Sequence, residues 1–181
     1  MHPNLPPSPW VLRFASLIRA GGSVLDVACG SGRHLRALAG RGWQLHGVDR
    51  DTDAFDTLRT IATLHEADLQ AAPWPFGAQR FDALIVTNYL WRPLLPALLD
   101  ALAPAGMLIY ETFADGQQNI GRPSNPDFLL RHGELLDMVR PRLRVIAFED
   151  GFVTTPRPAF VQRICAAAPP LGCAPHPAYN L

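Results

Sequence analysis

The stretch VLDVACGSGRHL, from Val24 to Leu35, decides how the rest of the chain is interpreted. An apolar run carries one aspartate, Asp26, and stops at Gly30 and Gly32 before a helix-like pattern begins. Glycine at such a junction lets a ligand approach the backbone closely, because no Cβ is in the way. Several classes of ligand bind at strand–glycine–helix turns, so the residues around the glycines must distinguish them.

Length and composition indicate one globular domain. The chain has 181 residues, 48% of them hydrophobic and 18% charged, which is enough for a substantial core. No apolar run approaches the roughly 20 residues that cross a bilayer. The Pro-rich N-terminus, interrupted by Arg13, is a poor secretory signal. We therefore expect a cytoplasmic protein with no membrane partner.

The formal net charge is zero, with 16 basic and 16 acidic residues, and every basic residue is arginine. A chain without a basic excess is not typical of nucleic-acid binders. The short cluster RPRLR, residues 140–144, is interpreted as a solvated connection between a helix and a strand. The charge pattern thus argues against a nucleic-acid partner.

Helical and strand patterns alternate along the chain, which predicts an α/β fold with a doubly wound, mostly parallel sheet and helices on both faces. The last two strands are expected to pair antiparallel. Residues 1–168 are expected to form one domain, with 1–22 as an N-terminal helix and lead-in, and 169–181 as a loosely packed Pro-rich tail. The expected helices span 9–20, 33–40, 53–61, 94–102 and 128–139, and the expected strands span 24–28, 43–49, 64–67, 81–89, 106–113, 144–153 and 159–168.

The glycine turn does not fit phosphate or dinucleotide sites well. A phosphate-binding loop needs a lysine after its last glycine, and this turn has none. A dinucleotide turn needs a third glycine or alanine where Leu35 stands. Asp26 would also repel a pyrophosphate, whereas it suits a cationic ligand such as the ammonium and sulfonium of S-adenosylmethionine. The turn therefore favours that cofactor.

Two further aspartates follow neighbouring strands, where ligands of such sheets bind. Asp49 can accept hydrogen bonds from both ribose hydroxyls, and Asp68 from the adenine amino group, with Leu69 beside the ring. Other roles remain open, because Asp26 could cap the turn and Asp49 could cap the next helix.

The three cysteines, Cys29, Cys165 and Cys173, show no C-x-x-C spacing and fit neither a disulfide framework nor a zinc site. We interpret Cys29 as a small buried side chain, and the histidines form no metal-like cluster in the sequence.

Four segments, in order, resemble class I S-adenosylmethionine-dependent methyltransferases. VLDVACGSGRHLRAL resembles their glycine motif, with Ala28 where a first glycine is common. VDRD (48–51) resembles their acidic ribose motif, ADLQAAPWPFGAQRFDALIVTNYL (67–90) their adenine segment and fourth strand, and LLDALAPAGMLIYET (98–112) the following helix and strand. The loop 111–135 also resembles small bacterial methyltransferases related to the tellurite-resistance type.

The resemblance implies a Rossmann-like, seven-stranded sheet with an antiparallel final strand, and S-adenosylmethionine as cofactor. The resemblance also implies that residues beside the three aspartates contact the cofactor. The expected cofactor-binding residues are Asp26, Ala28, Gly30, Gly32, Asp49, Arg50, Asp68, Leu69 and Asn88.

On the acceptor side we expect Tyr89, Glu111 and Arg122 to act. Methyl transfer from a sulfonium is an in-line displacement with a neutral leaving group, so positioning can supply much of the catalysis. Glu111 could act as a base, orient a cationic substrate, or pair with an arginine such as Arg122. The Gly- and Pro-rich segment 115–127 is long enough to be a lid.

The short chain has little inserted between its strands, which favours a small-molecule methyl acceptor. Two other functions remain open: a non-catalytic cofactor-binding module, and methylation of RNA or protein. The sequence leaves the oligomeric state undetermined.

Overall fold

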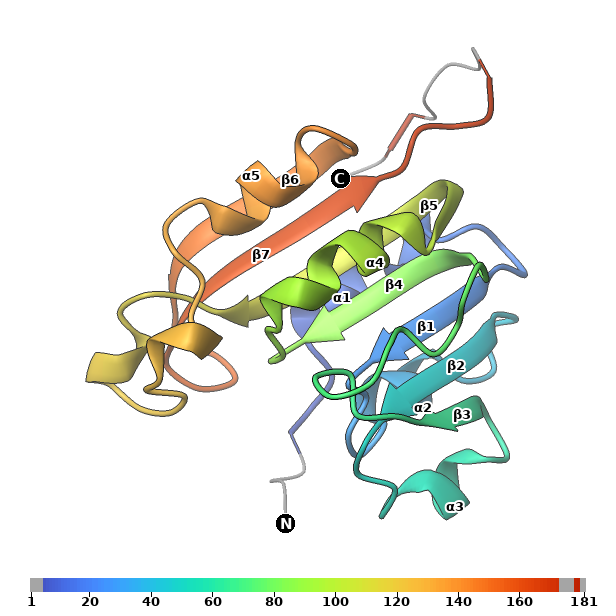
Figure 1. The fold of residues 1–181 in the computed structure, drawn as a ribbon, viewed down its shortest axis with the longest axis horizontal. Helices are drawn as coiled ribbons and strands as arrows, with labels where there is room; N and C mark the ends of the chain where they lie inside the picture. Colours follow the sequence, from blue (N-terminus) through green and yellow to red (C-terminus); the bar gives the residue numbers. More distant parts are fainter. Residues whose placement is uncertain (1–4, 173–177, 180–181) are drawn as a thin grey trace.

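A computed structural model describes residues 5–172 and 178–179 of the chain. Seven strands form one sheet in the order β3-β2-β1-β4-β5-β7-β6 (Figure 1). Pairing is parallel from β3 to β5, whereas β7 runs antiparallel to both β5 and β6. The predicted mixed sheet with one antiparallel strand is confirmed. The strands are β1 (Ser23–Val27), β2 (Gln44–Asp49), β3 (Thr63–Glu66), β4 (Phe81–Thr87), β5 (Leu102–Phe113), β6 (Arg144–Val153) and β7 (Ala159–Ala167).

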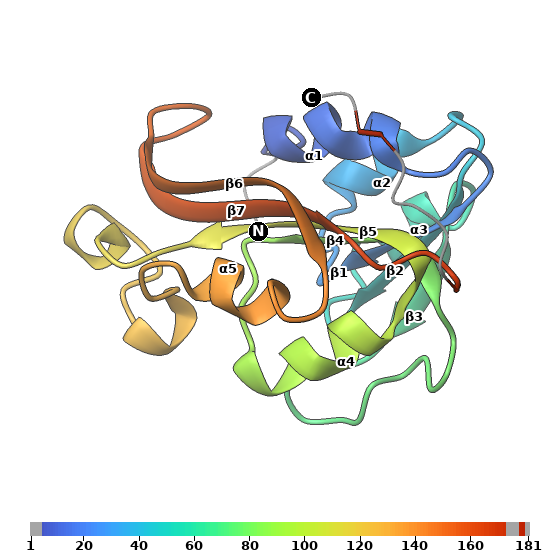
Figure 2. The same cartoon turned by 90° about the horizontal axis from the view of Figure 1, so that it is seen from above.

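Helices cover both faces of the sheet, as Figure 2 shows. One face carries α1 (Pro9–Phe14), α2 (Arg33–Leu38) and α3 (Phe55–Leu58), and the other carries α4 (Leu95–Asp100) and α5 (Glu134–Val139). Short 3-10 turns complete the secondary structure, at Ala15–Leu17, Arg92–Leu94, Gln117–Asn119 and Pro126–Phe128.

The sheet separates two apolar cores. Alternate residues of β4 point to opposite faces, so Leu84 and Val86 pack with α4, while Ala83 and Ile85 pack in the core that contains α1. Because both faces of the central strands are covered, their sequences read as continuous apolar runs.

Several predicted helices are shorter than the sequence pattern suggested. The helix expected over 128–139 begins at Glu134, because Gly133 has a φ of +72° and Leu130 pairs with Ala114 in an isolated bridge. The helix expected over 9–20 ends at Phe14 and continues only as a 3-10 turn. The helix expected over 53–61 is confined to α3.

The C-terminal tail meets the body of the protein at two described points. Pro169 O accepts a hydrogen bond of 3.0 Å from Ala105 N, and Tyr179 lies over Arg144 at 5.9 Å from its guanidinium carbon to the ring centroid. The other residues of the expected loose tail, 173–177 and 180–181, lie outside the described residues, and Cys173 is among them. Within the described part of the chain, no helix is long and apolar enough to cross a membrane.

Candidate active site

Two adjoining pockets lie at the carboxyl ends of the parallel strands, where β1 is flanked by β2 on one side and β4 on the other. This is the position at which sheets of this kind bind ligands. The glycine pocket is lined chiefly by Ala28, Gly30, Asp49, Thr87 and Asn88. The arginine pocket is lined chiefly by Arg33, Glu111, Phe113, Arg157, Val161 and Arg163. Both pockets share Leu5, Arg33 and Asn88, so a group bound in one lies next to a group bound in the other.

The turn after β1 requires a left-handed backbone at three positions. Ala28 has a φ of +54°, Gly30 of +51° and Gly32 of +74°. The positive φ explains why a glycine is common in the resembling family where Ala28 stands, since an L side chain is strained there. A Cβ on Gly30 would meet nothing within 4 Å, whereas one on Gly32 would collide with Leu58. Gly30 thus leaves open space beside the glycine pocket, and Gly32 serves the packing of α2.

Asp49, at the end of β2, braces this turn from the side of the pocket. Its Oδ2 accepts a hydrogen bond of 2.7 Å from Gly30 N, and its Oδ1 accepts one of 2.9 Å from Asp51 N. A carboxylate has about four acceptor positions, so both oxygens can accept further hydrogen bonds. Asp49 is half-buried and lines the glycine pocket. This position suits a carboxylate that accepts hydrogen bonds from ribose hydroxyls.

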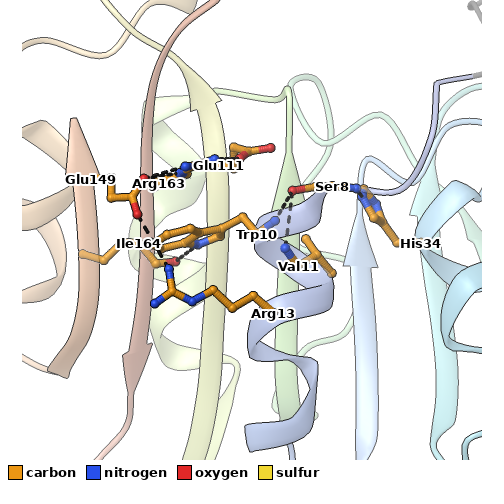
Figure 3. Close-up of polar contacts among 9 residues, drawn as sticks. All are labelled: Ser8, Trp10, Val11, Arg13, His34, Glu111, Glu149, Arg163 and Ile164. Atoms are coloured by element: carbon orange, nitrogen blue, oxygen red, sulfur yellow. Dashed lines mark hydrogen bonds and ion pairs between the residues drawn. The ribbon is translucent and has the colours of Figure 1, made fainter. Parts of the chain in front are cut away.

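Asp26 lies behind the pocket wall. Its side chain is buried, it is not among the residues that line the glycine pocket, and its Oδ2 has no hydrogen-bond partner within the described residues. His34 stands between it and the N-terminal segment, with Nδ1 at 3.6 Å from Asp26 Oδ2 and Nε2 accepting from Ser8 N at 3.1 Å. Ser8 in turn caps α1, which Figure 3 shows. Asp26 therefore does not face the glycine pocket, and it can influence a ligand there only through neighbouring groups such as His34.

The remaining expected cofactor residues occupy different places. Asn88, with a φ of +55°, lines both pockets. Asp68 Oδ1 accepts from Gln70 N at 2.9 Å, and Asp68 Oδ2 lies 3.7 Å from the exposed Arg50. Leu69 is buried in the core, and neither Asp68 nor Leu69 lines the glycine pocket.

Cys29 is buried in the turn, and burial raises the pKa of its thiol. The thiol is therefore held neutral, which agrees with a packing side chain.

Glu111 lies near the end of β5 and is held by Arg163 of β7 at 3.4 Å (Figure 3). Arg163 also contacts Glu149 at 2.8 Å and packs over Trp10 at 4.9 Å. Figure 3 shows these groups side by side, with Trp10 Nε1 donating to Ile164 O at 3.2 Å. Trp10 thereby ties the N-terminal helix to β7.

Glu111 does pair with an arginine, which is one of the three roles left open for it, but this arginine is not Arg122. Arg122 is exposed and lines neither pocket, and Arg163 makes the ion pair instead. The cause is the antiparallel pairing of β5 with β7, which sets Glu111 directly opposite Arg163.

Tyr89 does not line either pocket. Its hydroxyl is buried without a hydrogen-bond partner among the described residues, and burial raises its pKa. Its carbonyl accepts a hydrogen bond of 2.8 Å from Tyr110 OH, which fixes the backbone directly after Asn88.

Sequence reasoning missed Arg157, Arg163 and the contribution of Leu5 and Pro6 to the arginine pocket. The antiparallel pair of β5 and β7 could have indicated Arg163, had its register been known. No local pattern marks Arg157, which lies in the connection between β6 and β7.

Comparison with known proteins agrees with this geometry. Residues 24–106 match the family described as "Methyltransferase domain". A tRNA U34 carboxymethyltransferase of Cronobacter sakazakii is 31% identical over 113 residues, covering 55% of this chain and 35% of that protein. The chain thus matches only about a third of the length of this relative.

Solved structures share the fold. TehB from Haemophilus influenzae has a TM-score of 0.73 at 15% identity, covering 90% of this chain and 62% of that chain. The glycopeptide N-methyltransferase MtfA, solved with S-adenosylhomocysteine, has a TM-score of 0.62 at 17% identity, covering 92% and 91%. The solved structures confirm the predicted fold. The match over residues 24–106 relates that part of the chain to methyltransferase domains.

Proposed function

We propose that this protein transfers a methyl group from S-adenosylmethionine to a small-molecule acceptor. The observation that carries the proposal is the meeting of two pockets at Arg33 and Asn88. The glycine pocket would hold the cofactor, and the arginine pocket would hold the acceptor. Because the two pockets adjoin, the acceptor would lie beside the transferable methyl group.

The residues around the glycine pocket fit the cofactor. Gly30 leaves room for close approach, and Asp49 has acceptor capacity for the ribose hydroxyls. Asn88, which lines the glycine pocket, would contact the methionine part. Asp68 and Leu69, which do not line it, stay the proposed adenine contacts. When bound, S-adenosylmethionine supplies an electrophilic methyl group on a positively charged sulfur.

The chain's own contribution is to position the acceptor and to accept a proton. Glu111 is the only carboxylate among the described residues that line the arginine pocket. An acceptor that loses a proton on methylation could pass it to Glu111. Arg163 would hold Glu111 in place for this role, since their ion pair fixes the carboxylate at the pocket wall.

The evidence for a role on the acceptor side is weaker for Tyr89 and Arg122 than for Glu111, because neither of them lines the arginine pocket. We propose a positioning role for Tyr89, whose fixed backbone follows Asn88. We propose a single domain over residues 1–168, whose last strand, β7, ends at Ala167.

A macromolecular acceptor is the second candidate, because the curated relatives are named tRNA U34 carboxymethyltransferases. The positive charges of this chain favour an RNA acceptor less than a small molecule. The cluster at residues 140–144 lies at the start of β6, where Arg144 pairs with Ala167 at the end of β7. The arginine pocket lies at the opposite end of β7, beside Ala159, Val161 and Arg163. Arg142 also pairs with Asp100 at 2.6 Å. An RNA acceptor predicts binding that weakens steeply with salt, and a gel-shift titration with tRNA tests it.

Isothermal titration calorimetry with S-adenosylhomocysteine tests the proposed function directly. We expect saturable binding at a stoichiometry of one per chain. Absence of binding by the wild-type protein would overturn the proposal. Binding without methyl transfer to any acceptor in a broad panel of small molecules would instead support a non-catalytic cofactor-binding module.

A further inference from the structure

We infer that the acceptor carries a carboxylate, and that Arg33 and Arg157 bind it in the arginine pocket. The inference rests on the proposed function, because it names the acceptor class for the same site. Arg33 enters the pocket from the start of α2, and Arg157 from the connection between β6 and β7. The two side chains therefore belong to elements that only the fold brings together.

Three arginines line this pocket, and their charges are not equally balanced. Arg163 is paired with both Glu111 and Glu149, so its charge is already neutralised. Arg33 donates to Pro6 O at 3.3 Å and to Thr87 Oγ1 at 3.2 Å, both of which are neutral groups. Arg157 packs over Phe113 at 5.5 Å. Within the described residues, neither Arg33 nor Arg157 has a carboxylate within 4 Å.

Two positive guanidiniums that line one pocket disfavour each other. Arg33 is half-buried, and burial lowers the pKa of its guanidinium. Asp26 and Glu111 raise this pKa, and the positive charge of Arg157 lowers it by a smaller amount. A ligand oxyanion between them would replace this repulsion with two charge-assisted contacts.

The rest of the wall suits the body of an apolar acid. Phe113, Val153 and Val161 contribute apolar surface beside the arginines. Glu111 would repel a second negative charge, which limits the acceptor to one anionic end. An aromatic or alkyl monocarboxylate matches this combination of charge and apolar surface.

Arg33 lines both pockets, and Arg157 lines only the arginine pocket. This difference separates acceptor binding from cofactor binding. A substitution of Arg157 should leave affinity for S-adenosylhomocysteine within about twofold of wild type, because the side chain lies outside the glycine pocket.

The test is a calorimetric titration of benzoate and hexanoate, each compared with its neutral amide, with and without saturating S-adenosylhomocysteine. We expect at least one acid to bind about tenfold more tightly than its amide. Arg157→Gln should weaken that binding about threefold or more, since the side chain is exposed. Arg33→Gln should weaken it about tenfold, since that side chain is half-buried.

Arg41→Gln is the matched control, because Arg41 is exposed, lines neither pocket and lies outside segment 115–127. It should bind the acid as wild type does. Equal binding of both acids and their amides would overturn the inference, as would unchanged acid binding by Arg157→Gln. Failure to bind S-adenosylhomocysteine is a separate result that contradicts the proposed function, and the titration without that ligand still reports on the arginines.

Discussion

Asp49 Oδ2 accepts a 2.7 Å hydrogen bond from Gly30 N, which joins the end of β2 to the glycine turn that follows β1. One carboxylate thus shapes the turn and faces the pocket beside it. The two features come from neighbouring strands of the same sheet, because β1 and β2 pair in parallel and end together.

Asp49→Ala should weaken binding of S-adenosylhomocysteine about tenfold or more. The substitution removes the support of Gly30 N and the proposed acceptor for the ribose, and a hydrogen bond to a charged group contributes roughly 1.5–3 kcal/mol. Calorimetry measures the change. Asp51→Ala is the control, since Asp51 is exposed and its Oδ1 only accepts from Asp53 N. Equal affinity of Asp49→Ala and wild type would contradict the assignment.

Ser8→Ala should destabilise the protein by about 1 kcal/mol, the usual contribution of an N-cap side chain. Ser8 Oγ accepts from Trp10 N at 3.1 Å and from Val11 N at 3.3 Å at the start of α1. Denaturant unfolding measures the free energy of unfolding. Ser124→Ala, at an exposed position, should change it by less than about 0.5 kcal/mol. A Ser8→Ala variant as stable as this control would show that the cap contributes nothing.

The free energy of unfolding should decrease as the pH falls below about 6.5, and His46 should contribute to this decrease. Burial, followed by the nearby His65, lowers the pKa of His46 below 6.5. The unfolded chain therefore binds a proton first as the pH falls through about 6.5, and stability decreases from there towards the lower pKa of the folded state. His46→Phe should flatten this part of the profile.

The comparison requires the free energy of unfolding between pH 7.5 and pH 5 for both proteins. His46 packs against Phe81 at 5.4 Å and against His65 at 6.2 Å between ring centroids, so His46→Phe keeps an aromatic ring beside both neighbours while it removes the titrating group. A loss of stability equally steep in His46→Phe would assign the pH dependence to other groups.

We propose that segment 115–127 becomes more protected when the site is filled. Gln117 already fixes its base, because Oε1 accepts from Phe160 N at 3.0 Å and Nε2 donates to Arg122 O at 3.1 Å. Hydrogen exchange of these amides should slow when S-adenosylhomocysteine and benzoate are both present. Gln117→Ala should speed exchange in the same segment without ligand. Unchanged exchange on adding both ligands would contradict a lid.

Much of the fold could be predicted, because patterns of neighbouring residues indicate each strand and helix. The buried strands read as short apolar runs, and the alternation with helices required crossover connections in a parallel sheet. Helix ends were predicted less well. Gly133 interrupts the pattern before Glu134, and the pairing of Leu130 with Ala114 competes with helix formation.

The candidate site was predicted only in part. Asp49 and Gly30 follow directly from strand ends and glycine spacing, and they lie together in the structure. Asp26 follows from the same motif, yet it is buried behind His34. Whether a strand-end side chain faces the pocket depends on packing around it, which the motif does not contain.

The sequence by itself determined the α/β class, the glycine turn and the type of cofactor that this turn favours, because these depend on residues close together in the chain. Only the tertiary structure decided that Glu111 pairs with Arg163 and that Arg157 lines the same pocket as Arg33. Within each pair the two residues are separated by tens of residues, since Glu111 lies on β5 and Arg163 on β7, while Arg33 lies on α2 and Arg157 in the connection between β6 and β7. Their register follows from packing of the whole sheet, so no local pattern could specify the acceptor side of the site.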